Sequence, residues 1–341
     1  MSTDVLSEVL RAVRLTGAVF FKVEGSAPWV AETPAAELIA PHVMPGAEHV
    51  IDYHLIADGT CWAGLIDEPA VCLHKGDVIV FPHGDAHVMS STPGMRSAPD
   101  LDRFRHPSSG QLPIAISFNP SSSAERAQLV CGYLGCDARP FNPLLSTLPR
   151  MIHMPSDGGM VEQLIRFAVT ESATPRAGSE GMLTRLSELL FIEVVRSHLA
   201  SLPPETTGWL AGLRDEVIGR TLSTLHDRPA HPWSLEDLAK EVGLSRSMLA
   251  ERFHHYVGVP PMQYLARWRM QLAASLLSST NVSLAEVAER IGYGSEAALS
   301  RAFKRLVGVA PSAWRQGTRP DASDACAISL LPDEDQSSLD A

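Results

Sequence analysis

One pattern occurs twice in this chain, first as Ser234-Leu-Glu-Asp-Leu-Ala-Lys-Glu-Val-Gly243 and again as Ser283-Leu-Ala-Glu-Val-Ala-Glu-Arg-Ile-Gly292. Each copy begins with a serine that has an acidic residue three positions later, which is the pattern of a helix capping box. Apolar residues follow at helical spacing, and the final glycine suits the left-handed conformation that ends many helices. The pattern therefore predicts two short amphipathic helices, each closed by a glycine turn.

A second helix is predicted after each glycine turn. Leu249 and Phe253 form its apolar face in the first copy, and Leu299 and Phe303 repeat that spacing in the second. A helix, a tight turn and a second helix make the motif that places its second helix in the major groove of DNA. Residues 260–277 open with proline and then continue as a helix of about 27 Å. This linker helix can hold the two reading helices near one DNA turn apart, roughly 34 Å.

The region 209–318 resembles the DNA-binding domain of the AraC/XylS family of transcription regulators. The family's C-terminal signature is similar to two stretches of this sequence, Gly292-Tyr-x-Ser295 and Phe303-Lys-Arg-x-x-Gly308-x-x-Pro311-x-x-Trp-Arg315. The resemblance implies that a set of residues on the two reading helices faces DNA, namely Arg246, Ser247, Ala250, Glu251, Glu296, Ala297, Ser300, Arg301 and Lys304.

The charged members of this set have different expected roles. Arg246 and Arg301 are the leading candidates for guanine or phosphate contacts, because a guanidinium offers a planar fork of donors. The role of four more cations is open between phosphate contact and a solvated face, namely Lys304, Arg305, Arg267 and Arg269. Glu251 and Glu296 depart from the basic or amide residues often found there, so each either accepts from a cytosine amino group or lies off the interface.

The net charge of −11 is unevenly distributed along the 341 residues. Residues 209–318 carry +3, whereas residues 1–208 carry −9 and residues 319–341 carry −5. The acidity therefore lies outside the segment that would approach phosphate. The polar, acidic segment 319–341 is predicted to be disordered.

The composition predicts a soluble cytoplasmic protein with no membrane partner. No run approaches eighteen apolar residues, and the first ten residues lack the basic start and apolar stretch of a secretion signal. The five cysteines are odd in number and widely spread, unlike those of a secreted disulfide framework.

Residues 1–205 are predicted to form a separate domain, with a β-barrel over 16–155 and two helices over 158–200. Short runs rich in Val, Ile and Phe between Gly and Pro are typical of a small antiparallel barrel. Beyond the barrel the apolar period becomes helical. The second helix carries an apolar stripe that either packs on the domain's own sheet or forms a dimer seam. The stripe consists of Leu183, Leu186, Leu190, Val194 and Leu199.

The stretch Gly76-Asp-Val-Ile-Val-Phe-Pro-His-Gly-Asp-Ala-His87 matches the second cupin motif, Gly-x5-Pro-x-Gly-x2-His, at every fixed position. The segment from His54 to Trp62 resembles the matching hairpin of cupin-type sensor domains in AraC-family proteins. The expected fold class is therefore α+β, with a cupin-like barrel and helical hairpin followed by an all-α domain of two helix-turn-helix units joined by a linker helix. By strand parity and by this resemblance, the candidate effector-binding residues are His54, His87, Asp52 and Trp62.

A metal in the barrel is a second interpretation of the same histidines. The first cupin motif is degraded, because its expected ligands fall near Gly46, Glu48 and Asp52. Imidazoles and a thiol could still hold zinc or a similar divalent ion, and that candidate set is His54, Cys61, His83 and His87. The third interpretation is that these histidines are hydrogen-bonded core residues without a metal.

The leading functional hypothesis is a sequence-specific regulator of transcription without enzymatic activity, controlled by a small molecule or metal in the barrel. Its expected partners are duplex DNA, an effector, RNA polymerase and a second copy of the chain. One rival hypothesis makes the barrel a dimerisation scaffold without an effector. Another makes the chain a cupin metalloenzyme fused to a DNA reader, and the degraded first motif speaks against it.

Overall fold

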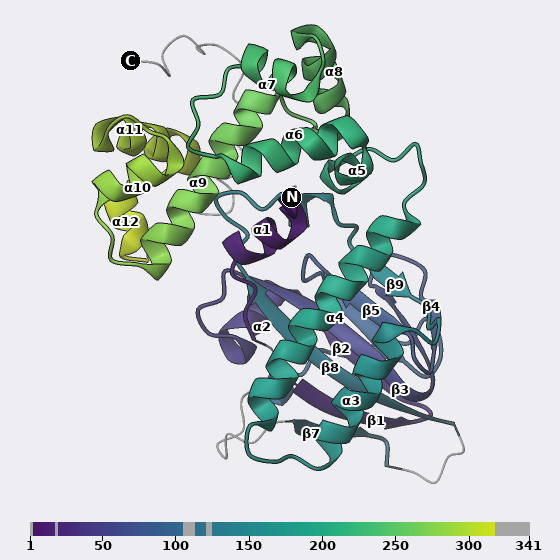
Figure 1. Ribbon diagram of the computed structural model, residues 1–341. Helices are drawn as coiled ribbons and strands as arrows, with labels where there is room; N and C mark the ends of the chain where they lie inside the picture. The colour runs from purple at the N-terminus through teal and green to yellow at the C-terminus, as the bar shows by residue number, and fades with distance from the viewer. Residues whose placement is uncertain (1–2, 18–19, 105–112, 121–124, 318–341) are drawn as a thin grey trace. The chain divides into compact units, whose positions relative to one another are not determined.

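The computed structural model describes residues 3–17, 20–104, 113–120 and 125–317 (Figure 1). The chain forms two compact units, a sheet unit and a helical unit. The sheet unit contains the described residues of 14–138 and 144–206, and the helical unit contains those of 1–13, 139–143 and 207–341. The segment 319–341, predicted to be disordered, lies outside the described residues. Within the described ranges, none of the helices is long and apolar enough to cross a membrane.

A curled sheet forms the body of the sheet unit (Figure 1). Its strands are β1 (Phe20–Ser26), β2 (Val30–Thr33), β3 (His49–Leu65), β4 (Val71–His74), β5 (Val78–Phe81), β6 (His87–Ser90), β7 (Ile114–Phe118), β8 (Arg126–Cys136) and β9 (Ile152–Met154). The long strand β3 pairs first with β5 and β8, and then with β4 and β6. The register between β3 and β8 shifts between Ile56 and Asp58. Such an irregularity increases local twist and bends a strand, so it helps the sheet to curl around its apolar core.

Helices α3 (Met160–Ala173) and α4 (Ser179–Ser201) pack against each other and against the sheet. Of the predicted stripe, Leu183, Leu186, Leu190 and Val194 are almost completely buried within this unit, and Leu199 is half-buried. Of the two interpretations of the stripe, packing on the domain's own sheet is therefore the one that the structure supports. The unit also contains helix α2 (Ala36–Val43) and two short 3-10 turns, η1 (Leu101–Phe104) and η2 (Leu145–Thr147).

The helical unit contains the duplicated motif. Its helices are α1 (Val5–Ala12), α5 (Trp209–Arg214), α6 (Glu216–Asp227), α7 (Leu235–Val242), α8 (Arg246–Val257), α9 (Pro261–Ser279), α10 (Leu284–Ile291), α11 (Glu296–Val307) and α12 (Pro311–Arg315). Both predicted serine caps form, because each serine hydroxyl accepts from the backbone N–H three residues later at 3.1 Å. The glycines that end α7 and α10 adopt φ values of +77° and +80°. The repeat is therefore two helix-turn-helix units, α7–α8 and α10–α11.

The linker helix α9 contacts α8, α10, α11 and α12. Tyr264 is buried against Phe253 of the first helix-turn-helix unit. Ala273, Ala274 and Leu277 are buried in the core of the second. One continuous helix thus supplies part of the core of both helix-turn-helix units, so both are packed on α9.

Two segments from outside 209–318 complete the helical unit. Helix α1 and residues 139–143 belong to it, although α1 precedes the strands in the sequence and residues 139–143 lie between β8 and β9. The buried Gln271 amide of α9 donates to the Ala12 carbonyl at 3.1 Å and accepts from the Phe141 backbone N–H at 3.0 Å. Sequence patterns do not reveal this arrangement, because the contacts join positions more than a hundred residues apart.

The two equivalent turn glycines allow a matched stability test. Gly243 has open space where a Cβ would lie, whereas a Cβ on Gly292 would lie 2.3 Å from the Ala230 carbonyl oxygen. We expect Gly243→Ala to lower the free energy of unfolding by about 1 to 2 kcal/mol, the cost of the left-handed conformation for an L-residue. Gly292→Ala should cost clearly more, because it adds a backbone clash. Urea unfolding followed by tryptophan fluorescence measures both, and equal losses would contradict the argument from the contact with Ala230.

A buried histidine in the helical unit predicts acid sensitivity. His226 stacks on Trp268 and its Nε2 lies 2.8 Å from the Tyr264 hydroxyl. That hydroxyl accepts from the indole N–H of Trp209 at 2.9 Å, so its own proton is free to be donated to His226. Burial lowers the pKa of His226 to about 3.

Because the folded-state pKa of His226 is below the unfolded value of about 6.5, the unfolded chain binds the extra proton first. Stability should therefore be retained above pH 6.5 and fall as the pH drops towards 3. His226→Gln keeps an acceptor for Tyr264 without the titration, so its slope of stability against pH should be smaller by up to about 1.4 kcal/mol per pH unit. Denaturation of both proteins between pH 4 and 7 tests this, and parallel curves would contradict it.

Candidate functional site

The predicted DNA-facing residues lie on the open faces of α8 and α11. Leu249 and Phe253 are fully buried on α8, and Leu299 and Phe303 are fully buried on α11. The opposite faces carry the predicted residues, which are exposed except for the half-buried Ala250 and Ser300. Each face begins at a capping serine, since Ser245 and Ser295 accept from backbone N–H groups of the first helical turn. Both second helices thus present an uncovered, largely polar side at their N-terminal ends.

The arginines of this region fall into two groups. Within the described part of the chain, Arg246 and Arg301 form no ion pair, so their guanidinium groups are available to an outside acceptor. Arg252 is bound to Asp215 at 2.6 Å, and Arg269 donates to the backbone carbonyls of Pro229 and His231. Arg269, which the sequence left open between phosphate contact and solvated face, therefore has a structural role.

Two exposed residues on α8 were not among the predicted DNA-facing residues. His254 and His255 are exposed at the positions that Lys304 and Arg305 occupy on α11, because Leu249 aligns with Leu299. Extending the alignment of the two copies past the phenylalanines would have found them. The equivalent positions thus carry imidazoles on α8 and permanently charged side chains on α11.

A buried pair of histidines lies in the sheet unit. His54 on β3 and His87 on β6 approach with their Nε2 atoms 2.9 Å apart, and His87 stacks on Phe81. His87 Nδ1 lies 2.9 Å from the Asp85 carbonyl oxygen. Burial lowers the pKa of His54 well below its usual range and that of His87 to about 4. Both rings are therefore neutral near pH 7.

Asp52 lies beside this pair and is completely buried. Its Oδ2 is 3.9 Å from His87 Nδ1, and neither carboxyl oxygen has a hydrogen-bond partner among the described residues. Burial raises the pKa of Asp52 well above its ordinary value. Burial thus disfavours the charged forms of both Asp52 and His87, so the contact between them adds little Coulombic energy.

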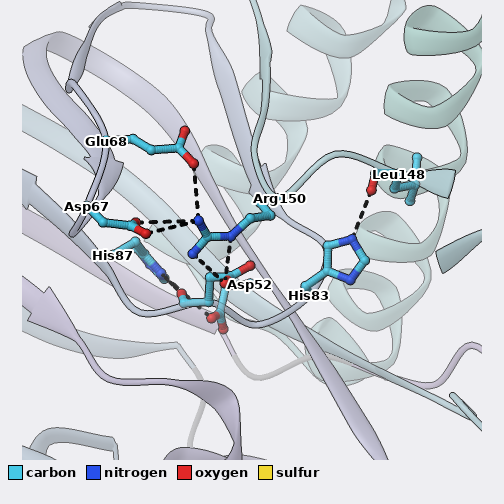
Figure 2. A network of polar contacts seen from close by, with 8 residues as sticks. Asp52, Asp67, Glu68, His83, His87, Leu148 and Arg150 are labelled. Carbon is cyan, nitrogen blue, oxygen red and sulfur yellow. Dashed lines mark hydrogen bonds and ion pairs between the residues drawn. The ribbon is translucent and has the colours of Figure 1, made fainter. Parts of the chain in front are cut away.

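The predicted metal set does not come together. Figure 2 shows His83 turned towards Leu148, whose carbonyl lies 2.9 Å from His83 Nε2, and away from His87. Nearby, Arg150 binds Asp67, Glu68 and Asp85. Among the described residues, no group of three or more His, Cys, Asp or Glu side chains could hold a metal ion. Of the predicted set of His54, Cys61, His83 and His87, the structure brings His54 and His87 together and turns His83 to Leu148.

A cavity of about 170 Å³ opens into the curled sheet. Its wall is mainly apolar and aromatic, and includes Phe21, Val23, Trp29, Met89, Ile116, Phe118, Leu129 and Tyr133. Of the four predicted effector-binding residues, only His54 lines it. His87 and Asp52 are buried behind the wall, and Trp62 pairs with Cys72 and Ser90 at the far half of β3. Strand parity alone could not place these residues along the cavity.

Comparison with known proteins agrees with both units. A family model described as cupin matches residues 4–200, and one described as a helix-turn-helix domain matches residues 238–317. A protein of Streptomyces lividans described as an AraC-like transcription regulator is 34% identical over 278 residues, which are 79% of this chain and 88% of that protein. The transcriptional regulator AlkR of Acinetobacter baylyi is 28% identical over 318 residues, covering 92% of this chain and 99% of that protein.

Among solved structures, the DNA-binding domain of AdpA in complex with a target DNA is 29% identical and has a TM-score of 0.29. The match covers 30% of this chain and 93% of that one. Together, the duplicated helix-turn-helix motif, the cupin match and the long relative at 34% identity settle the family. The chain belongs to the AraC-like transcription regulators, DNA-binding proteins that here combine an N-terminal cupin domain with a C-terminal helix-turn-helix domain.

Proposed function

We propose that this regulator reads two adjacent major grooves with α8 and α11, and that a small molecule in the cavity of the sheet unit controls this binding. The observation that carries the first part is the pair of open, equivalent helix faces mounted on the single helix α9. Nineteen residues of α9 span about 28 Å at 1.5 Å each. This length is compatible with reading positions roughly one DNA turn of 34 Å apart.

The two faces support different kinds of reading. On α11, Arg301, Lys304 and Arg305 combine one candidate for guanine recognition with cations for the backbone. On α8, the position of Arg301 is taken by Glu251, which can accept from a cytosine amino group but repels phosphate. We therefore assign the larger electrostatic share of DNA binding to α11.

Effector control is supported by the cavity and its surroundings. A concave, mainly apolar site with a few polar groups is where small molecules commonly bind. A molecule that favours one conformation of the regulator shifts its DNA affinity by its difference in affinity between the two states. The effector site in this proposal is the cavity, whose wall does not include His87, Asp52 or Trp62.

The proposal includes two protein partners. Met182 and Leu189 are exposed by 45% and 53% and lie two helical turns apart on α4, which supports self-association of two copies through this helix. Contact with RNA polymerase follows from the role of a transcription regulator.

Two neighbouring cations of α11 distinguish base reading from backbone contact. Arg301→Ala should weaken binding to a selected DNA site by about 1 to 3 kcal/mol and relax its sequence preference, because a forked contact to guanine is lost. Lys304→Ala should weaken selected and random DNA alike and reduce the salt slope by about one. Fluorescence anisotropy with both DNAs over a salt series measures these effects. Equal losses of Arg301→Ala on both DNAs would remove Arg301 from base reading.

Filling the cavity should abolish effector control. Ile116 lines the cavity, so Ile116→Phe places extra volume where a ligand would lie. We expect DNA affinity of the wild-type protein to change when a small-molecule cell extract is added, and that of the variant to stay constant. Ile66→Phe, at a partly exposed position outside the cavity wall, is the matched control and should respond like the wild type. An undiminished response of Ile116→Phe would place the effector elsewhere.

A further inference from the structure

The cavity has room for a molecule of about one ring. An engineered protein cavity of about 150 Å³ binds benzene, and this cavity measures about 170 Å³. Its walls present aromatic faces and edges, with Trp29 and Phe118 5.9 Å apart between ring centroids, and Phe21 and Tyr133 also 5.9 Å apart. A flat, apolar ligand therefore fits both the size and the surface.

The acidic groups of the cavity wall are already neutralised. Glu32 accepts two hydrogen bonds from Arg96, both at 2.8 Å. Asp100 is bound to Arg103 at 2.9 Å, and the Arg103 guanidinium also lies over the Phe118 ring. A charged ligand would have to compete with these pairs or lose its hydration in an apolar space. The wall therefore favours a neutral ligand.

The proton positions of the histidine pair follow from their partners. The Asp85 carbonyl can only accept, so His87 Nδ1 carries a proton and donates to it. Because burial keeps His87 neutral, its Nε2 has no proton and accepts. His54 Nε2, 2.9 Å away, must then be the donor. The remaining nitrogen, His54 Nδ1, is therefore an acceptor.

This acceptor has no partner inside the protein. His54 is 8% exposed, and its Nδ1 is buried without a hydrogen-bond partner among the described residues. His54 lines the cavity, whereas His87, which occupies the other ring nitrogen, does not. An unsatisfied acceptor is unfavourable to bury. A ligand that supplies the missing donor would relieve this cost.

We propose that the cavity binds a neutral, single-ring-sized apolar molecule that carries a hydroxyl or N–H group, and that this group donates a hydrogen bond to His54 Nδ1. The inference rests on the proposed role of the cavity as effector site and adds the chemical class of the ligand. A site that contains a buried acceptor selects against analogues of equal shape that lack the donor, because the acceptor is then left unpaired.

Phenol and toluene are matched probes, since they differ only in a hydroxyl in place of a methyl group. The dissociation constants of both are measured on the full chain by calorimetry and expressed as the ratio of toluene to phenol. Comparing this ratio between protein variants cancels the different hydration of the two compounds. His54→Gln places its amide nitrogen near the position of Nε2, so it keeps a donor for His87 and removes the Nδ1 acceptor.

We expect His54→Gln to lower the ratio about 5- to 10-fold, the range that one neutral hydrogen bond supplies. His54→Asn, which offers an amide oxygen near the position of Nδ1, should keep the ratio close to that of the wild type. Ile116→Val, which only enlarges the cavity, should change both dissociation constants in parallel. An unchanged ratio in His54→Gln would overturn the hydrogen bond, and failure of both compounds to bind the wild type would overturn the ligand class.

A second measurement needs only the wild-type protein, so it applies even if a variant does not fold. In the wild type, the 15N resonance of His54 Nδ1 should move on addition of phenol and stay in place with toluene, and the reverse would contradict the proposal. DNA affinity with and without phenol is measured separately. If the toluene-to-phenol ratio changes as predicted but phenol leaves DNA affinity unchanged, the ligand site is upheld and effector control is overturned. Failure of the ligand site and failure of effector control are therefore distinguishable.

Discussion

The burial of helix α9 is the constraint on which the helical unit depends. Tyr264 and Trp268 are almost fully buried near its start, where Tyr264 accepts from Trp209 and donates to His226. Near its end, Trp314 donates to the Ala274 carbonyl and packs on Phe303. Helix α9 thus contributes to the cores of both helix-turn-helix units. The orientation of α8 and of α11 is set by their packing on α9. Gln271, midway along, adds the bonds to Ala12 and Phe141 that tie α1 and residues 139–143 to the unit.

The two helix-turn-helix units share a backbone conformation but differ in the charges on their open faces. Both have a serine cap, a left-handed glycine and two buried apolar residues on the second helix. The open faces, where packing imposes no restriction, carry Glu251 and His254 in one copy and Arg301 and Lys304 in the other. Folding requires the shared residues, so the freedom to differ lies in the residues of the open faces. Two modules of one shape can therefore make unequal contributions to affinity and to sequence preference.

In the sheet unit, burial decides the chemistry of the polar residues. Removal from water keeps His54 and His87 neutral and raises the pKa of Asp52, because each charged form would lose its hydration. Neutral imidazoles can each donate once and accept once, and the Asp85 carbonyl sets the direction of the whole chain of bonds. The two histidines thus form a chain of hydrogen bonds that ends at the Asp85 carbonyl, beside an apolar cavity.

Local sequence was sufficient to predict much of the secondary structure of this protein. The helix-turn-helix repeat was predictable because caps, glycine turns and apolar spacing act over only a few residues, and the family match at 34% identity agrees with that analysis. The strands around His54 and Ile79 were predictable for the same reason. Only the tertiary structure decided which interior residues line the cavity, that His83 faces Leu148, and that Gln271 joins three distant segments. These outcomes depend on strand curvature and on contacts between positions far apart in the chain, and periodicity along the sequence carries no information about either.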